Sequence, residues 1–415
     1  MFFISPIFGV ILSYVIFLVS FFIPSGLFYS LVGEYNYGYL SVENFCLVTV
    51  SVVFFVLGLR CYGFFPKKNS DNSNVSKDLE IPVNALIYLL VLLNVLMFII
   101  IYLIIKNNAG LISTVLYYSG GVKTLKTDMD LTGTYASVTS AIYGLSIWCL
   151  YSYFKIRDKL LLSKRKIYFF LIFLLYLLLI IKTLILLARF ELMPILLSFV
   201  VIFLWSKYKD GKSLRVFIML IAFFLSIISI FFIISSLRNT DGTSHDSWVS
   251  FFGYVFVPYS HLGALLMGKL RYYDPGFGYY AINYLNSLPV IGNSFTSNYL
   301  GWTDSYLVWQ KEFQDTWKAG LNGDLIWITA FGYLWVSLKF FTPIYMFVNG
   351  LLVQHIWLGF KREKLIGVVF YPWCFFCILF WFGMNMISFR TTLYLFISYT
   401  FAVCFTFLCK KNNRS

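Results

Sequence analysis

Charged side chains are scarce in this 415-residue chain. They make up 12% of the residues, whereas hydrophobic residues make up 60% and the mean hydropathy is +0.79. Soluble domains carry about 25% charged residues, so this composition excludes a soluble protein of the ordinary kind. Apolar runs of about 20 residues recur instead, and a helix of this length crosses roughly 30 Å of hydrocarbon. We therefore expect an all-α, polytopic transmembrane helix bundle.

Signatures of several kinds of chemistry are missing as well. The chain has three histidines, and His245 and His261 are 16 residues apart without the spacing of metal ligands, so we expect no metal site. It has no glycine-rich nucleotide motif and no recognisable Ser-His-Asp order, which disfavours a cytoplasmic ATPase or sugar-nucleotide enzyme. Cys374 and Cys377 lie one helical turn apart in an apolar run, which favours packing over redox chemistry. We expect neither a cofactor nor a disulfide framework.

The hydropathy pattern predicts about ten spans. They cover approximately residues 4–24, 42–59, 82–105, 135–154, 167–188, 190–206, 216–237, 333–358, 365–388 and 391–409. The first apolar stretch lacks the basic start and the Ala-x-Ala exit of a cleavable signal peptide, so we expect it to form the first span. The chain then divides into residues 1–237 with seven spans, a long outer loop at 238–332, and residues 333–415 with three spans and a tail.

Basic residues are concentrated in alternate loops. The loops after the second, fourth, sixth, eighth and tenth spans hold 20 of the 32 Lys and Arg residues, but only six of the 18 acidic ones. By the positive-inside rule these loops face the cytoplasm, together with both termini. The net charge of +14 therefore reflects membrane topology and requires no nucleic-acid partner.

Residues 248–268 leave the number of spans open, with eleven or twelve as alternatives to ten. This segment is apolar enough either to dip into the membrane or to cross it. If it crosses, Leu325–Leu338 must cross too, and residues 269–320 would move to the inner side. We favour ten spans and a membrane-associated segment at 248–268, because Leu325–Leu338 is short for a span and Lys339 interrupts the run.

Several cations are predicted on the outer side, where the positive-inside rule does not explain them. Lys182 lies inside the fifth span, and Arg189 follows seven residues later on the same helix face. Arg238 and Arg390 end the seventh and ninth spans. These side chains are candidates for a shared pyrophosphate-binding pocket, because a charge in a span usually faces a cavity or a partner. Alternatively, the terminal arginines reach lipid phosphates and Lys182 pairs with Glu191 or another carboxylate.

The long outer loop holds the candidate proton carriers. A histidine with a pKa near neutral can take the proton of an attacking hydroxyl, so we favour His245 as the base, followed by His261 and then by Asp246 or Asp324. Arg271 is a further candidate for pyrophosphate binding and opens a tyrosine-rich stretch. Aromatic rings beside carboxylates commonly hold sugars, although the same rings also fit an interfacial aromatic belt.

The layout resembles that of bacterial O-antigen polymerases of the Wzy type. The resemblance rests on about ten spans, a basic inner side, the motif LLARFELMP at Leu186–Pro194 between two close spans, and the long outer loop late in the chain. It also rests on GDLIWITAFGYLW at Gly323–Trp335, where the chain re-enters the membrane.

This resemblance implies a lipid-donor glycosyltransferase with a GT-C-like fold in the bacterial inner membrane, acting in lipopolysaccharide biosynthesis. It would move a growing glycan from undecaprenyl pyrophosphate onto a newly flipped, lipid-linked repeat unit on the periplasmic face. The implied partners are undecaprenyl-pyrophosphate-linked glycans and a chain-length regulator protein of the inner membrane. The lipid pyrophosphate is the leaving group, so the reaction requires neither a nucleotide nor a metal.

Two rival functions remain open from the sequence. An O-antigen ligase uses the same donor and also has a long outer loop, but transfers the glycan to lipid A core. A lipid-linked oligosaccharide flippase or other transporter would carry charges through the middle of many spans and often has repeated halves, and no internal repeat is visible here.

Overall fold

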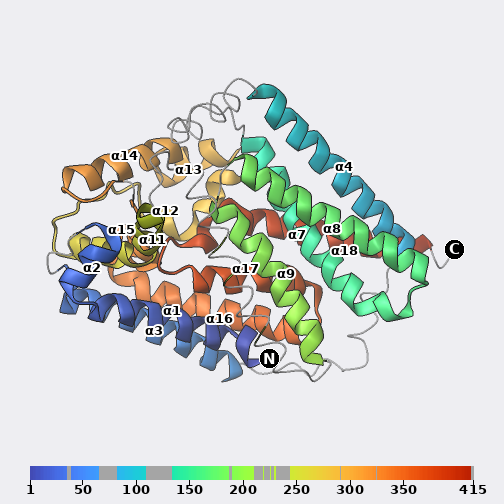
Figure 1. The fold of residues 1–415 in the computed structure, drawn as a ribbon, viewed down its shortest axis with the longest axis horizontal. Helices are drawn as coiled ribbons and strands as arrows, with labels where there is room; N and C mark the ends of the chain where they lie inside the picture. The colour runs from blue at the N-terminus through green and yellow to red at the C-terminus, as the bar shows by residue number, and fades with distance from the viewer. Residues whose placement is uncertain are drawn as a thin grey trace.

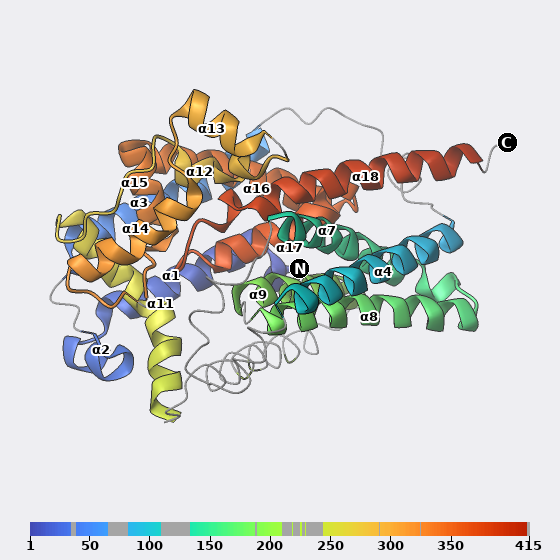
Figure 2. The same cartoon turned by 90° about the horizontal axis from the view of Figure 1, so that it is seen from above.

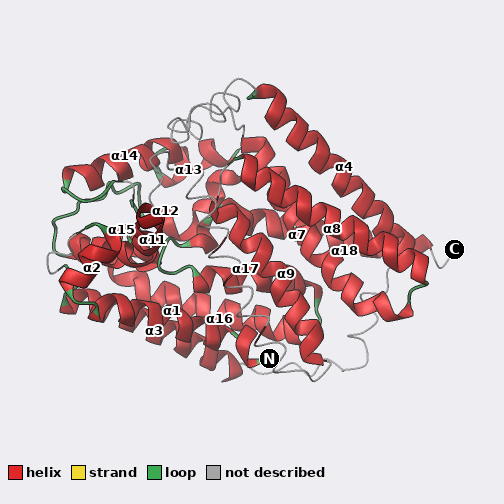
Figure 3. Cartoon of the chain, viewed as in Figure 1, coloured by secondary structure: helices red, strands yellow, loops and turns green. Residues whose placement is uncertain are grey.

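The computed structural model describes residues 1–34, 39–64, 82–108, 133–186, 189–209, 244–289, 291–323 and 325–412, together with 218, 225 and 229. Within these residues the chain forms helices joined by loops and no strand, as Figure 3 shows. The prediction of an all-α protein is therefore confirmed.

The first half of the chain supplies α1 (Pro6–Phe22), α2 (Ser25–Val32), α3 (Val42–Cys61), α4 (Val83–Asn107), α7 (Gly133–Ile156), α8 (Leu162–Ile185) and α9 (Arg189–Lys209). The second half supplies α11 (Ser244–Leu266), α12 (Tyr279–Ile282), η6 (Asn283–Ser287), α13 (Gly292–Leu300), α14 (Ser305–Lys318), α15 (Thr329–Leu338), α16 (Thr342–Lys361), α17 (Leu365–Leu379), η8 (Met386–Ser388) and α18 (Arg390–Asn412). Figure 1 shows their arrangement.

Several of these helices are long and apolar enough to cross a membrane. The described residues contain seven such helices, or eight if α1 and α2, which are bent by 113° at a short break, count as one span. This fits a multi-pass membrane protein. The predicted span at 216–237 lies almost wholly outside the described residues.

Helices α3 and α16 cross very closely because glycines face each other. A Cβ atom added to Gly58 would lie 2.1 Å from the carbonyl oxygen of Phe347, and one added to Gly350 would lie 2.2 Å from that of Phe55. Only residues without a side chain allow this approach, and small residues commonly occupy helix contacts in membrane proteins.

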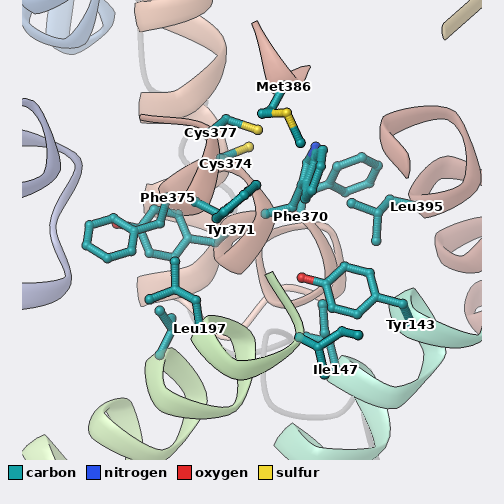
Figure 4. Close-up of a cluster of buried hydrophobic side chains, with 14 of the residues drawn as sticks. Tyr143, Ile147, Leu197, Phe370, Tyr371, Cys374, Phe375, Cys377, Met386 and Leu395 are labelled. Atoms are coloured by element: carbon teal, nitrogen blue, oxygen red, sulfur yellow. The ribbon is translucent and has the colours of Figure 1, made fainter. Parts of the chain in front are cut away.

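Helix α17 forms the centre of the bundle. It contacts α1, α7, α9, α16 and α18, and its residues from Gly367 to Ile378 are all buried. Figure 4 shows part of this core, where Phe370, Tyr371 and Phe375 of α17 lie among side chains of α7, α9 and α18.

The predicted span at 365–388 is wrong at its outer end, because α17 ends at Leu379. At about 1.5 Å per residue its 15 residues reach only about 22 Å, which is too short to cross the hydrocarbon. The chain is non-helical from there to η8, yet it stays largely buried. Neighbouring segments satisfy its backbone: the carbonyl oxygen of Trp381 accepts a hydrogen bond from the amide of Ala330 (2.9 Å). Irregular backbone inside a membrane bundle requires such partners.

The ends of the bundle that were predicted to be basic lie together. Tyr62 after α3 bonds His355 of α16 (2.6 Å), Lys164 of α8 donates to Asn84 of α4 (3.0 Å), and Lys155 of α7 pairs with Glu363 after α16 (3.1 Å). The Met1 amine belongs to the same end, because burial and the nearby charge of Lys361 lower its pKa. We refer to this end as the basic end.

The opposite end carries a layer of shorter helices. This layer comprises α12 to α15 and their connections, residues 267–289, 291–323 and 325–338, and we refer to it as the cap. Figure 1 shows the cap together with α2 and α11 in the left-hand part of the molecule. The chain turns from α15 into α16 through a 3-10 turn at Lys339–Phe341, where Lys339 has a φ of 50°. This turn interrupts the regular α-helix, but Thr329–Lys361 as a whole is one of the seven helices long and apolar enough to cross a membrane, and it covers the predicted span at 333–358.

Helix α11 lies across the bundle. Its sequence is long and apolar enough for a span. Figure 2 nevertheless shows it running crosswise to α1, α16 and α18, and Figure 1 shows it nearly end-on. Ser20 near the end of α1 donates to the carbonyl oxygen of Phe256 (3.3 Å), and Asn44 at the start of α3 donates to that of Tyr259 (2.7 Å). Helix α11 thus rests on the cap-side ends of α1 and α3.

Candidate functional site

A buried histidine and a buried carboxylate meet between α2, α11 and the cap. Nε2 of His261 lies 3.0 Å from Oε1 of Glu34, and the exposed fractions of the two side chains are 0% and 8%. His261 comes from the last turns of α11. Glu34 follows α2, where Gly33 in the left-handed region (φ 68°) ends the helix and redirects the chain. Charged groups are rarely buried unless they are paired, so this contact is a strong local feature.

The contact orients both side chains. The second oxygen of Glu34 accepts a hydrogen bond from the backbone amide of Asn322 in the cap (3.2 Å), so two separate parts of the chain, α11 and the cap, hold this carboxylate. A carboxylate only accepts hydrogen bonds, and Nε2 is therefore the ring nitrogen that carries the proton. In the neutral imidazole, the lone pair is then on Nδ1.

Nδ1 of His261 is buried and has no hydrogen-bond partner within the described part of the chain. The hydroxyl of the preceding residue, Ser260, is in the same state. Buried polar atoms are usually hydrogen-bonded, so an unpartnered ring nitrogen beside an orienting carboxylate indicates a group that interacts with something else. A histidine oriented by a carboxylate is the usual arrangement of a general base.

A second buried carboxyl group lies inside the cap. The hydroxyl of Tyr280 (α12) donates to Oε1 of Glu312 (α14) at 2.7 Å, and Glu312 is only 3% exposed. Burial raises the pKa of this carboxyl to about 8; the hydrogen bond from Tyr280 opposes the rise, whereas the nearby charge of Asp315 adds to it. Glu312 is therefore mainly protonated at neutral pH.

One stretch of the cap touches both carboxyl groups. The amide of Asn322 bonds Glu34, and four residues later the carbonyl oxygen of Ile326 accepts from the hydroxyl of Tyr272, which lies beside Glu312. The buried pair and the tyrosine-rich interior of the cap are thus parts of one connected structure.

A small cavity lies at the broken end of α17. Asn349, Asn385, Cys374 and Cys377 are among its lining residues, and its volume is about 20 Å³. This is room for about one water molecule and is far too small for a sugar. Asn385 also fastens the cap to the bundle, because its amide donates to the carbonyl oxygen of Tyr280 (2.8 Å) and to the hydroxyl of Tyr345 (3.2 Å).

Of the proton carriers predicted from the sequence, His261 is the one whose surroundings are described. His245 and Asp246 lie in the first turn of α11, but their side chains are outside the described residues. Asp324 is outside them altogether. The preference for His245 over His261 therefore stays a prediction.

The predicted phosphate-binding cations do not contact one another in the described part of the chain. Lys182, buried in the last turn of α8, forms a close ion pair with Glu191 at the start of α9, which is the alternative left open above. Arg271 in the cap and Arg390 at the start of α18 are exposed. The side chain of Arg189, which begins α9, lies outside the described residues, as does the whole of Arg238.

Two residues of this region were not predicted as site residues. Glu34 is the only acidic residue in the connection between α1 and α3 and follows an uncharged apolar helix. A single carboxylate in such surroundings was the sequence feature that could have indicated a site residue. Glu312 lies in a run of polar and aromatic residues with the pattern of an amphipathic helix. Only the packing of α14 shows that this carboxyl is turned inward.

Comparisons with protein-family models, with curated proteins and with solved structures find no match to this chain.

Proposed function

We propose that this protein is a lipid-donor glycosyltransferase of the O-antigen polymerase type. It would join undecaprenyl-pyrophosphate-linked repeat units on the periplasmic face of the bacterial inner membrane, with a GT-C-like fold and without a metal. The observation that carries this proposal is the buried His261–Glu34 pair, which lies under a helical cap at the end of the bundle opposite the basic end.

The position of this pair agrees with the sidedness of the reaction. If the basic end is cytoplasmic, as the positive-inside rule requires, both the cap and the pair face the periplasm. Lipid-linked repeat units become available on that face after they have been flipped. The donor is already activated by its pyrophosphate, so the protein needs to supply a base, a way to offset negative charge, and a surface for the two lipids.

The proposed step is a substitution at the anomeric carbon of the donor glycan. The acceptor hydroxyl forms the new C–O bond and gives its proton to Nδ1 of His261, while Glu34 stabilises the resulting imidazolium through Nε2–H. The bond from the anomeric carbon to the pyrophosphate oxygen breaks, and the lipid pyrophosphate leaves with the electron pair. Since the imidazole is fully buried, the side chains over it must move aside when the acceptor binds.

The outer cations would offset the charge of the leaving group. Lys182, Arg189, Arg238, Arg271 and Arg390 remain the candidates for this role. For Lys182, an incoming pyrophosphate has to replace Glu191, whose side chain is half exposed and can turn toward solvent.

The test is gel analysis of surface lipopolysaccharide from a strain that lacks the gene and carries it on a plasmid. We expect the deletion to leave core with a single repeat unit, and the plasmid to restore the ladder. His261→Ala should reduce chain extension by about 100-fold or more, the usual contribution of a general base, while the protein stays in the membrane. His355→Ala at the basic end is the matched control and should leave the ladder unchanged.

Two other outcomes would contradict the proposal. A normal ladder from His261→Ala would remove this residue from the reaction. Core without any repeat unit in the deletion strain would exclude the polymerase and favour the ligase or the flippase. The side of the membrane on which the lipid-linked sugar accumulates would then distinguish these two.

A further inference from the structure

The lipid-facing surface of α1 is a regular apolar stripe. Ile11, Val15, Val19 and Phe22 follow one another at helical spacing, and their exposed fractions are 48%, 46%, 47% and 71%. Apolar side chains exposed on one face of a membrane span lie against acyl chains. This stripe therefore marks the path of the bilayer along α1 up to its last residue.

Apolar side chains are also exposed beyond the bend, on α2. After the 113° turn, Leu27 (51%) and Tyr29 (43%) are exposed on α2, which contains no charged residue. One face of α2 is held in place, because Phe28 and Val32 are fully buried in a cluster that includes residues of α11.

Helix α11 extends this apolar surface. Trp248 near its start is 49% exposed, and α2 contacts α11 more extensively than it contacts any other helix. Figure 2 shows α2 and α11 side by side at one end of the bundle, with α11 crosswise to the spans. We call Phe22, Leu27, Tyr29 and Trp248 the shelf.

We infer that the shelf lies in the outer leaflet of the bilayer, at the boundary between acyl chains and head groups. The position of α2 in the chain carries this assignment, because α2 begins at Ser25, just after the last residue of the α1 span, and exposes apolar side chains there. The chemistry agrees: the shelf is uncharged, and Tyr and Trp are the side chains enriched at this boundary. Helices that lie in the interface plane bury one apolar face in the same region.

The two helices that carry the shelf also lead to the buried pair. Glu34 follows the last residue of α2 by two positions, and His261 belongs to α11, so both helices of the shelf contribute to the pair. A lipid that rests its chain on the shelf would hold its head group near His261. If the proposed function is correct, the shelf is the docking surface for the isoprenoid chain of a lipid-linked substrate.

The experiment measures depth in the membrane and not activity. Cys46, Cys61, Cys404 and Cys409 are first replaced by serine, because they are exposed or half-buried, whereas the other three cysteines are buried. Single cysteines are then introduced as Leu27→Cys and Tyr29→Cys in the full chain, spin-labelled and reconstituted into lipid bilayers. Collision rates with oxygen and with a water-soluble nickel chelate report the depth of each label.

Two further labels calibrate the measurement. Val15→Cys lies in the middle of the α1 stripe, and Tyr306→Cys lies on α14 in the cap, where the side chain is 57% exposed. We expect the label at Leu27 to be at least threefold less accessible to nickel than the label at Tyr306, and shallower than that at Val15. If the labels at both Leu27 and Tyr29 are as accessible to nickel as the label at Tyr306, the shelf lies in water and the inference is wrong.

A second measurement separates the shelf from the proposed function. Leu27→Glu places a charge in the outer leaflet and should reduce chain extension at least tenfold, whereas Tyr306→Glu should not. If the labels show lipid exposure but Leu27→Glu extends chains normally, the shelf stands as a membrane anchor, and its role in substrate binding is refuted.

Discussion

The protonation of Glu312 should make the stability of the cap depend on pH. Its pKa is about 8 in the folded protein and 4.5 in an exposed carboxyl, so the folded cap binds a proton that the unfolded cap releases between these values. Stability that depends on this proton is fully present below about pH 4.5 and is lost as the pH rises to about 8. At 1.36 kcal/mol for each pH unit, the full loss is about 5 kcal/mol.

This loss follows from the surroundings of the carboxyl. Glu312 is buried against Tyr280 of α12 and Tyr333 of α15, with Tyr272 and Asp315 nearby. In the described part of the chain none of these neighbours is a cation that could stabilise the ionised form. Burial also raises the pKa of Tyr280 and Tyr272, so these groups stay neutral throughout the range in which Glu312 titrates.

The assay is hydrogen exchange of the amides of α12 and α14 in the full protein in bilayers. Protection factors remove the intrinsic dependence of exchange on pH, so they report the opening free energy. We expect protection in both helices to fall by at least tenfold between pH 5 and pH 8. In Glu312→Gln, which keeps a neutral side chain of the same shape, the fall should disappear. Constant protection in the native protein, or an equal fall in the variant, would refute the reasoning.

Two further predictions concern the bundle. Asn385→Ala removes two donated hydrogen bonds, one to the cap and one to α16. We expect the free energy of unfolding to fall by about 1–3 kcal/mol. Proteolysis should become faster in the cap, while α4 in the same protein stays intact and serves as the internal reference. Gly58→Ala places a methyl group against the backbone of α16. We expect it to lower the free energy of unfolding by about 1–3 kcal/mol or more, which is measured as a lower thermal midpoint in detergent. Gly26→Ala is its control, because no atom lies within 4 Å of the added carbon; equal midpoints for the two variants would contradict the close crossing.

The sequence predicted the features that depend on local composition. A span is an apolar run of sufficient length, so α3 (Val42–Cys61) begins at the predicted position and ends within two residues of it. Loop charge is also local, and the ends predicted to lie on one side indeed meet in contacts such as Lys155–Glu363. Both properties follow from the transfer of individual side chains between water and lipid, which requires no knowledge of neighbouring helices.

The remaining features could be decided only by tertiary packing. Helix α11 has the apolarity of a span, but α1, α2 and α3 supply the surface on which it lies crosswise. Helix α17 ends at Leu379 because the cap offers hydrogen-bond partners to the unwound chain that follows. His261 was a candidate from its residue type alone, whereas its partner Glu34 is 227 positions away in the sequence. A buried pair of this kind depends on how helices pack against each other in space, and local patterns of hydropathy or charge do not predict that packing.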